Sequence, residues 1–169
     1  MCGPETPSST PRVGARVDFF SHTSSSCSSS DSNSRPIGNL LFLNPSSPSS
    51  SLATHVRFQQ PPRADKLNSS KSLSTDSILV SIHLTGDLTK PVSDSGLLRQ
   101  FTLCRGCEAV NGDGDGSLFE MPLREALSMN VGQDGIIGRR VSMTRGGELL
   151  ADGIVGFNFL PPAAATTSL

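Results

Sequence analysis

The sequence predicts a mainly β protein, an antiparallel Greek-key sandwich or barrel that follows a disordered N-terminal arm. Three observations predict it: short apolar runs that alternate with period two, glycine-rich turns between these runs, and no sustained helical period. The expected organisation is an arm over residues 1–52, a β domain over residues 53–160 and a flexible tail over residues 161–169.

The arm is predicted from composition. Residues 1–51 contain sixteen serines and six prolines, and their main apolar run is Leu40 to Leu43. Such a stretch buries too little apolar surface to offset the entropy lost on ordering, so we expect it to be disordered. Within it, residues 16–19 (RVDF) resemble a short motif that binds protein phosphatase 1 by strand addition, although four-residue matches are common by chance.

Two strands open the β domain. Residues 54–59 alternate, with Val56 and Phe58 on one side, and two prolines then end the strand. Residues 77–85 form the clearest strand of the chain, because four apolar side chains share one face. These are Ile78, Val80, Ile82 and Leu84.

The middle of the domain is predicted from its turns. An apolar segment spans residues 97–110, and residues 111–116 (NGDGDG) favour a hairpin turn because glycine and asparagine tolerate positive φ. A returning strand is expected over residues 117–121. Pro122 then suits the first position of a short helical turn over the sequence LREAL.

The domain ends with two further strands. They are expected over residues 136–143 and 149–157, joined by a tight turn at Arg145-Gly146-Gly147. The closing sequence PPAAATTSL reads as a tail.

Charge and hydropathy exclude several classes of partner. The 14 basic and 15 acidic side chains include no basic block, so nucleic acid is not expected as a partner. The longest apolar runs are far shorter than the roughly 18 residues that span a membrane. The N-terminus lacks a basic region followed by an apolar one, so we expect a cytoplasmic protein, or alternatively import into an organelle through the Ser-rich N-terminus. The four cysteines are expected to be reduced thiols.

Four segments, in order, resemble the superoxide-dismutase-like domain of copper chaperones, within the Cu/Zn superoxide dismutase superfamily. They are VRF at 56–58, SIHLTGDLTK at 81–90, IIGR at 136–139 and ADGIVG at 151–156. The resemblance covers residues 53–160 and implies a Greek-key fold.

The resemblance also implies that most of the metal site is missing. The family's copper site needs four histidines, because imidazole suits copper in both oxidation states. The chain keeps His83, and the other three ligand positions hold Ser81, Leu98 and Thr144. The family's disulfide positions hold Val92 and Asp152. No catalytic residue is therefore assigned, and dismutase activity is not expected.

Copper or zinc binding remains an alternative function. His83 would act with Cys104 and Cys107, which form the Cys-x-x-Cys sequence of the chain. Residues three apart on a regular strand face opposite ways, so both sulfurs reach one ion only if Gly106 allows a bulge. A third interpretation is a degenerate gene product, marginally stable because it lacks the family's metal and disulfide.

Recognition is the function that survives the loss of the ligands. In the family, the loop after the His strand, the Ile-Gly corner and the last strand form an isologous dimer interface. The corresponding residues here are Gly86, Asp87, Ile137, Gly138, Val155 and Gly156. The expected partner is a Cu/Zn superoxide dismutase-like protein, or a second copy of this chain in a dimer.

Overall fold

Eight strands and one short 3-10 helix account for the regular structure of the described residues. The computed structural model describes residues 12–21, 36–60, 77–103 and 118–159. The strands are β1 (Arg12–Ser21), β2 (Pro36–Leu43), β3 (Leu52–Gln59), β4 (Ile78–Ile82), β5 (Arg99–Leu103), β6 (Leu118–Ser128), β7 (Arg140–Arg145) and β8 (Glu148–Phe159), with the helix η1 (Val92–Ser95) between β4 and β5. The prediction of a mainly β protein is confirmed.

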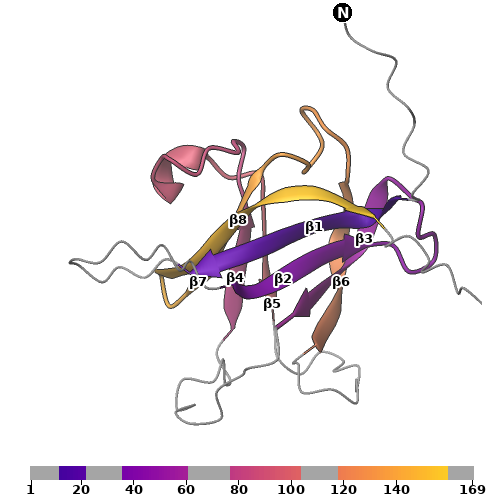
Figure 1. Cartoon of the computed structure of the whole chain (residues 1–169), viewed down its shortest axis with the longest axis horizontal. Helices are drawn as coiled ribbons and strands as arrows, with labels where there is room; N and C mark the ends of the chain where they lie inside the picture. Colours follow the sequence, from indigo (N-terminus) through magenta and orange to yellow (C-terminus); the bar gives the residue numbers. More distant parts are fainter. Residues whose placement is uncertain (1–11, 22–35, 61–76, 104–117, 160–169) are drawn as a thin grey trace, which may run out of the picture.

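All eight strands belong to one antiparallel sheet, in the order β5-β4-β7-β8-β1-β2-β3-β6. Strands β8, β1 and β2 lie side by side in Figure 1. The two edge strands, β5 and β6, approach each other where Arg99 and Glu125 form an ion pair at 3.5 Å. The sheet therefore curls into a nearly closed barrel.

The core fills the inside of this barrel. Alternate residues of each strand point inward, as the period of two requires. The largest buried side chains include Phe19 of β1, Phe42 of β2 and Phe58 of β3. Burying one such side chain stabilises the fold by roughly 1.5–3 kcal/mol relative to leaving it exposed. The first 59 residues thus supply a large share of the core.

The prediction of a disordered arm is wrong for β1 and β2. Strand β1 lies between β8 and β2, and β2 lies between β1 and β3. Val17 and Phe19 point inward and have no exposed surface, whereas Arg16 and Asp18 point outward. The phosphatase-like motif is therefore part of the core, and both edges of its strand are already paired. The other residues of the predicted arm before residue 36 lie outside the described part of the chain.

The predicted helical turn after Pro122 is also wrong. The sequence LREAL continues strand β6, which pairs with β3 and places Pro122 opposite His55. Proline cannot donate a hydrogen bond to a sheet, but it is tolerated on an edge strand. Because β6 is at the edge, the chain passes through Pro122 without leaving the strand.

The remaining predicted elements have shifted ends. The strand expected over residues 77–85 stops at Ile82, and Leu84 is 52% exposed. The strand expected over residues 136–143 starts at Arg140, because Gly138 turns the chain with a φ of 80°. The turn at residues 145–147 is confirmed, and both of its glycines have positive φ. The predicted hairpin at residues 111–116 lies outside the described residues. Within the described part of the chain, the structure has no helix suited to crossing a membrane.

Candidate functional site

His83 follows β4 and is buried, with 5% of its surface exposed. Its Nδ1 lies 2.7 Å from the Gly96 carbonyl oxygen, and its Nε2 lies 2.8 Å from Ser142 Oγ. A carbonyl oxygen only accepts, so Nδ1 carries a proton and donates it to Gly96. In the neutral ring, Nε2 then accepts from the Ser142 hydroxyl. Nδ1 thus ties the two ends of the loop after β4 together, and Nε2 ties this loop to strand β7.

The positions assigned to the other copper ligands are only partly close to His83. Leu98 is close, because its N–H donates to the Ile82 carbonyl at 2.8 Å, next to His83. Ser81 accepts a hydrogen bond from Gln100 Nε2 at 2.9 Å. Thr144 lies further from His83, since it pairs with Leu79 near the start of β4, whereas His83 follows the end of this strand. The β7 side chain that reaches His83 is therefore Ser142, which sequence reasoning did not identify.

No metal centre is formed by the described residues. Among them, no three His, Cys, Asp or Glu side chains converge. Cys104 and Cys107 lie outside the described part of the chain, so their proposed pairing with His83 stays a prediction.

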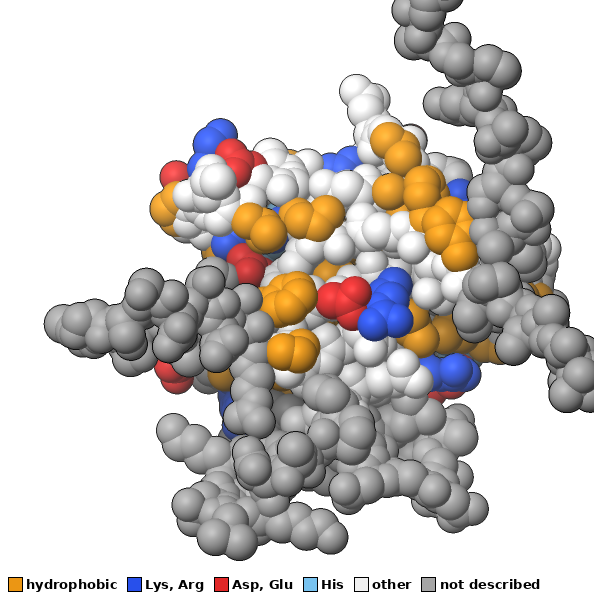
Figure 2. Space-filling model, in the orientation of Figure 1, with side chains coloured by type: hydrophobic (Ala, Val, Ile, Leu, Met, Phe, Trp, Pro, Cys, Tyr) orange, Lys and Arg blue, Asp and Glu red, His pale blue; other side chains and the backbone are white. Residues whose placement is uncertain are grey.

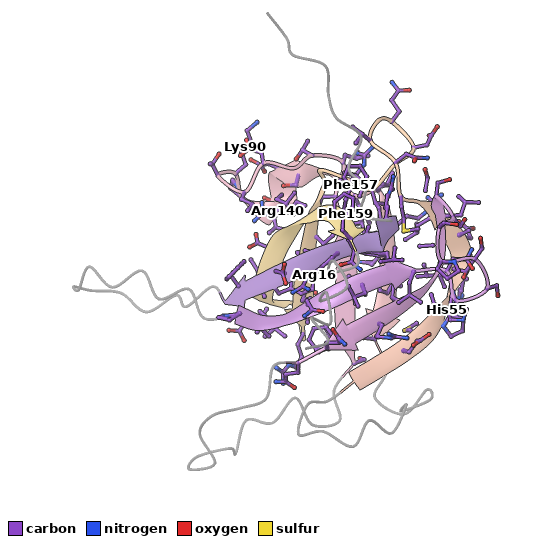
Figure 3. All side chains as sticks on the ribbon, turned by 45° about the vertical axis from the view of Figure 1, so that its right-hand side comes forward. Arg16, His55, Lys90, Arg140, Phe157 and Phe159 are labelled. Atoms are coloured by element: carbon purple, nitrogen blue, oxygen red, sulfur yellow. The ribbon has the colours of Figure 1, made fainter. Side chains whose placement is uncertain are left out.

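A buried ion pair lies beside His83, between β7 and β8. Arg140 and Asp152 are 2% and 5% exposed, and Arg140 Nε donates to Asp152 Oδ2 at 2.9 Å. Arg140 Nη1 donates to the Lys90 carbonyl at 2.7 Å and to Ser95 Oγ at 3.2 Å. Figure 3 shows Arg140 beneath the loop that carries Lys90. One guanidinium therefore links β7, β8 and the loop between β4 and β5.

Three segments that are far apart in the sequence meet just before the start of β7. They are Gly86–Asp87, Ile137–Gly138 and Val155–Gly156, and we call them the glycine patch. The Gly138 N–H donates to the Val155 carbonyl at 2.8 Å. A Cβ atom placed on Gly86 would lie only 2.0 Å from the Gly138 carbonyl oxygen, so the two backbones are in direct contact. The structure thus brings the predicted interface residues together.

The members of the patch differ in exposure. Gly86, Gly138 and Gly156 are exposed, whereas Val155 is 1% exposed and belongs to the core. Val155 can therefore contribute only its backbone to an outward face. With no side chains on the three glycines, a partner can approach the backbone closely.

Asp87 supplies the charge of the patch. The Thr89 hydroxyl and backbone N–H both donate to Asp87 Oδ1, at 2.6 and 2.9 Å, and Lys90 Nζ lies 3.6 Å from Oδ2. These hydrogen bonds, chiefly that of the Thr89 hydroxyl, lower the pKa of Asp87 below its ordinary value. Asp87, like an ordinary aspartate, is an anion at neutral pH, and these hydrogen bonds hold it in one orientation.

Exposed apolar side chains adjoin the patch in the chain, and sequence reasoning missed them. Leu84 and Leu88 flank Gly86–Asp87 and are 52% and 45% exposed, and Phe157, directly after Gly156, is 40% exposed. Phe157 and Phe159 lie next to each other at the end of β8 (Figure 3). In Figure 2, apolar side chains form several separate groups and charged side chains are few. The alternating pattern predicted that Leu84 faces the core with Ile78, Val80 and Ile82. Alternation alone does not show where a strand ends, and β4 ends before Leu84.

The chain matches no family model, no curated protein and no solved structure.

Proposed function

We propose that this chain is a recognition domain, related to the superoxide-dismutase-like domain of copper chaperones and inactive as a dismutase. It docks through the glycine patch on a dismutase-type protein or on a second copy of itself. The observation that carries the proposal is the meeting of Gly86, Gly138 and Gly156 at one exposed site, although 70 residues separate the first from the last.

The strand order supports the proposed kinship. In a Greek key, three consecutive strands lie side by side and a fourth returns to lie beside the first. Strands β4 and β5 are neighbours, β7 pairs with the other side of β4, and β6, at the opposite edge of the sheet, reaches β5 through the Arg99–Glu125 ion pair. We infer that the sheet closes between β5 and β6, which would give the order β7-β4-β5-β6 of a Greek key.

The chemistry around His83 supports the absence of dismutase activity. A copper ligand needs an available imidazole nitrogen, and both ring nitrogens of His83 lie at hydrogen-bond distance from other groups, Nδ1 from the Gly96 carbonyl at 2.7 Å and Nε2 from Ser142 Oγ at 2.8 Å. The neighbouring positions carry the hydroxyl of Ser81 and the apolar side chain of Leu98. A single imidazole does not hold copper in a redox-active geometry.

The surface chemistry of the patch supports docking. Interfaces of this kind combine an apolar centre with a few oriented polar groups. Leu84 and Leu88 offer apolar surface, and the anionic Asp87 offers a fixed hydrogen-bond acceptor. An isologous dimer would place this surface against its own copy around a two-fold axis.

Sedimentation velocity of the full chain tests the proposal, alone and mixed with a Cu/Zn superoxide dismutase. The test variant is Gly156→Glu, because the nearest atom to a Cβ at Gly156 is 4.0 Å away and a side chain fits without a clash. The matched control is Ser51→Glu, an exposed position before β3 on another part of the surface. We expect the wild-type chain and Ser51→Glu to associate equally, and Gly156→Glu to bind at least about tenfold more weakly. A monomer in every sample, with no complex, would refute docking.

A further inference from the structure

The loop between β4 and β5, residues 83–98, has little apolar core of its own. Three of its four leucines, Leu84, Leu88 and Leu97, are 52%, 45% and 54% exposed. The fourth, Leu98, ends the loop and packs partly buried against the core. In the helix η1, Ser95 is the one buried residue. Because so little apolar surface of this loop is buried, the hydrophobic effect contributes little to its conformation.

Polar contacts to Arg140 replace the missing core. The Arg140 side chain reaches three groups spread along the loop, the carbonyls of Asp87 and Lys90 at 3.3 and 2.7 Å and Ser95 Oγ at 3.2 Å. The Arg140 backbone adds two more bonds, from its N–H to the Thr85 carbonyl and from the His83 N–H to its own carbonyl. Arg140 therefore contacts the loop at both ends and in the middle.

Asp152 fixes the guanidinium in the orientation that these contacts need. Its Oδ2 accepts from Nε and Nη2 of Arg140 at 2.9 and 2.5 Å, which leaves Nη1 directed at the loop. Hydrogen bonds to a charged group are about twice as strong as neutral ones, and they gain further strength in a buried setting. The pair thus anchors the loop to the rigid strands β7 and β8.

We propose that Arg140 is a positioning residue, which holds loop 83–98 in place and thereby sets the Gly86–Asp87 part of the glycine patch against Gly138. Gly86, whose backbone contacts the Gly138 carbonyl, lies directly between Thr85 and Asp87, and the carbonyls of both accept hydrogen bonds from Arg140. The part of this proposal that concerns partner binding rests on the docking function proposed above. The part that concerns the order of the loop does not.

Hydrogen exchange of the full chain, followed by mass spectrometry, tests the role of Arg140. Arg140→Lys keeps a cation beside Asp152 but has one nitrogen in place of three, so it cannot bond to Asp152 and to all three loop groups together. Arg140→Met/Asp152→Leu replaces the whole pair by apolar side chains, a change that buried ion pairs often tolerate. The matched control is Arg57→Met/Glu120→Leu, which removes an Arg–carboxylate pair between β3 and β6.

We expect peptides from residues 84–96 to exchange about tenfold faster or more in both test variants, because the loop loses bonds to a charged donor. Peptides from β1, β2 and β3 should exchange as in the wild type, and the control should leave the loop unchanged. Unchanged loop exchange in both test variants would overturn the proposal. Loss of the sheet signal in circular dichroism for both variants would also overturn it, because Arg140 would then support the whole barrel and not the loop.

Sedimentation of the same variants separates this proposal from the docking function. If the wild type forms a complex, both test variants should bind more weakly than the Arg57→Met/Glu120→Leu control, and equal binding would refute the link to docking. If the wild type forms no complex, faster loop exchange would still support the positioning role, while the docking function would fail.

Discussion

Replacing Phe19 by alanine removes a large side chain from the centre of the barrel. Phe19 lies on β1 with no exposed surface, inside a region whose composition suggests disorder. Truncating a buried phenylalanine to alanine costs about 3–5 kcal/mol, through lost burial and the cavity left behind. A domain usually has about 5–15 kcal/mol of stability, so the variant should lose a large fraction of it.

Urea unfolding followed by far-ultraviolet circular dichroism measures this loss, since the chain has no tryptophan or tyrosine for fluorescence. With an m-value of about 2 kcal/mol/M, the midpoint should fall by about 2 M. Phe20→Ala is the matched control, because Phe20 is the next residue, points outward and is 44% exposed. We expect it to cost at most about 1 kcal/mol. Equal, small effects at both positions would show that residues 12–21 are not a strand of the sheet.

Four further predictions have defined outcomes. Arg140→Met should lower the free energy of unfolding by about 3–5 kcal/mol, measured in urea, because it removes the cation beside the buried Asp152 carboxylate. Arg140→Met/Asp152→Leu should recover most of this loss. Equal losses in the two variants would contradict the expectation. Thr89→Ala should raise the pKa of Asp87 toward its ordinary value in a carboxyl NMR titration. A lowered pKa means that ionised Asp87 stabilises the fold, and that this contribution is lost as the pH falls through the pKa of the folded state. The variant should therefore lose less stability in acid than the wild type. An unchanged titration would show that the Thr89 hydroxyl does not lower the pKa of Asp87. Gly86→Ala should lower the melting temperature, since its Cβ would lie 2.0 Å from the Gly138 carbonyl oxygen, whereas Gly156→Ala should not. Elemental analysis after expression with copper and zinc should find well below one ion per chain; one ion that disappears in Cys104→Ser/Cys107→Ser would instead establish the metal carrier.

The sequence predicted the strands whose alternation is long and clearly bounded. Strands β3 and β8 lie where period two and flanking turns placed them, and β4 has the expected inward face. Strand β1 was missed although Ala15, Val17 and Phe19 alternate with charged residues, because the average composition of a long Ser-rich stretch outweighed this short local pattern. A window of five residues would have found it.

Only part of the candidate site could be predicted from the sequence. The resemblance to a family placed Gly86, Gly138 and Gly156 in one interface, and the structure brings them together. It treated Asp152 only as a lost disulfide position. The structure shows that Asp152 of β8 pairs with Arg140, and that Arg140 bonds to the loop that contains Val92, the other lost disulfide position. The ion pair thus connects the loop and the strand that the family's disulfide would connect. No local pattern reveals such a pair, because its two members come from neighbouring strands and their partners from a distant loop.

The most direct test of docking at the glycine patch is an NMR map of amide shifts. Isotope-labelled chain would be titrated with unlabelled Cu/Zn superoxide dismutase and, separately, followed on dilution. Docking at the patch predicts that the largest changes occur at the amides of Gly86, Gly138 and Gly156. Changes confined to β2 and β3, or no change in either experiment, would contradict it.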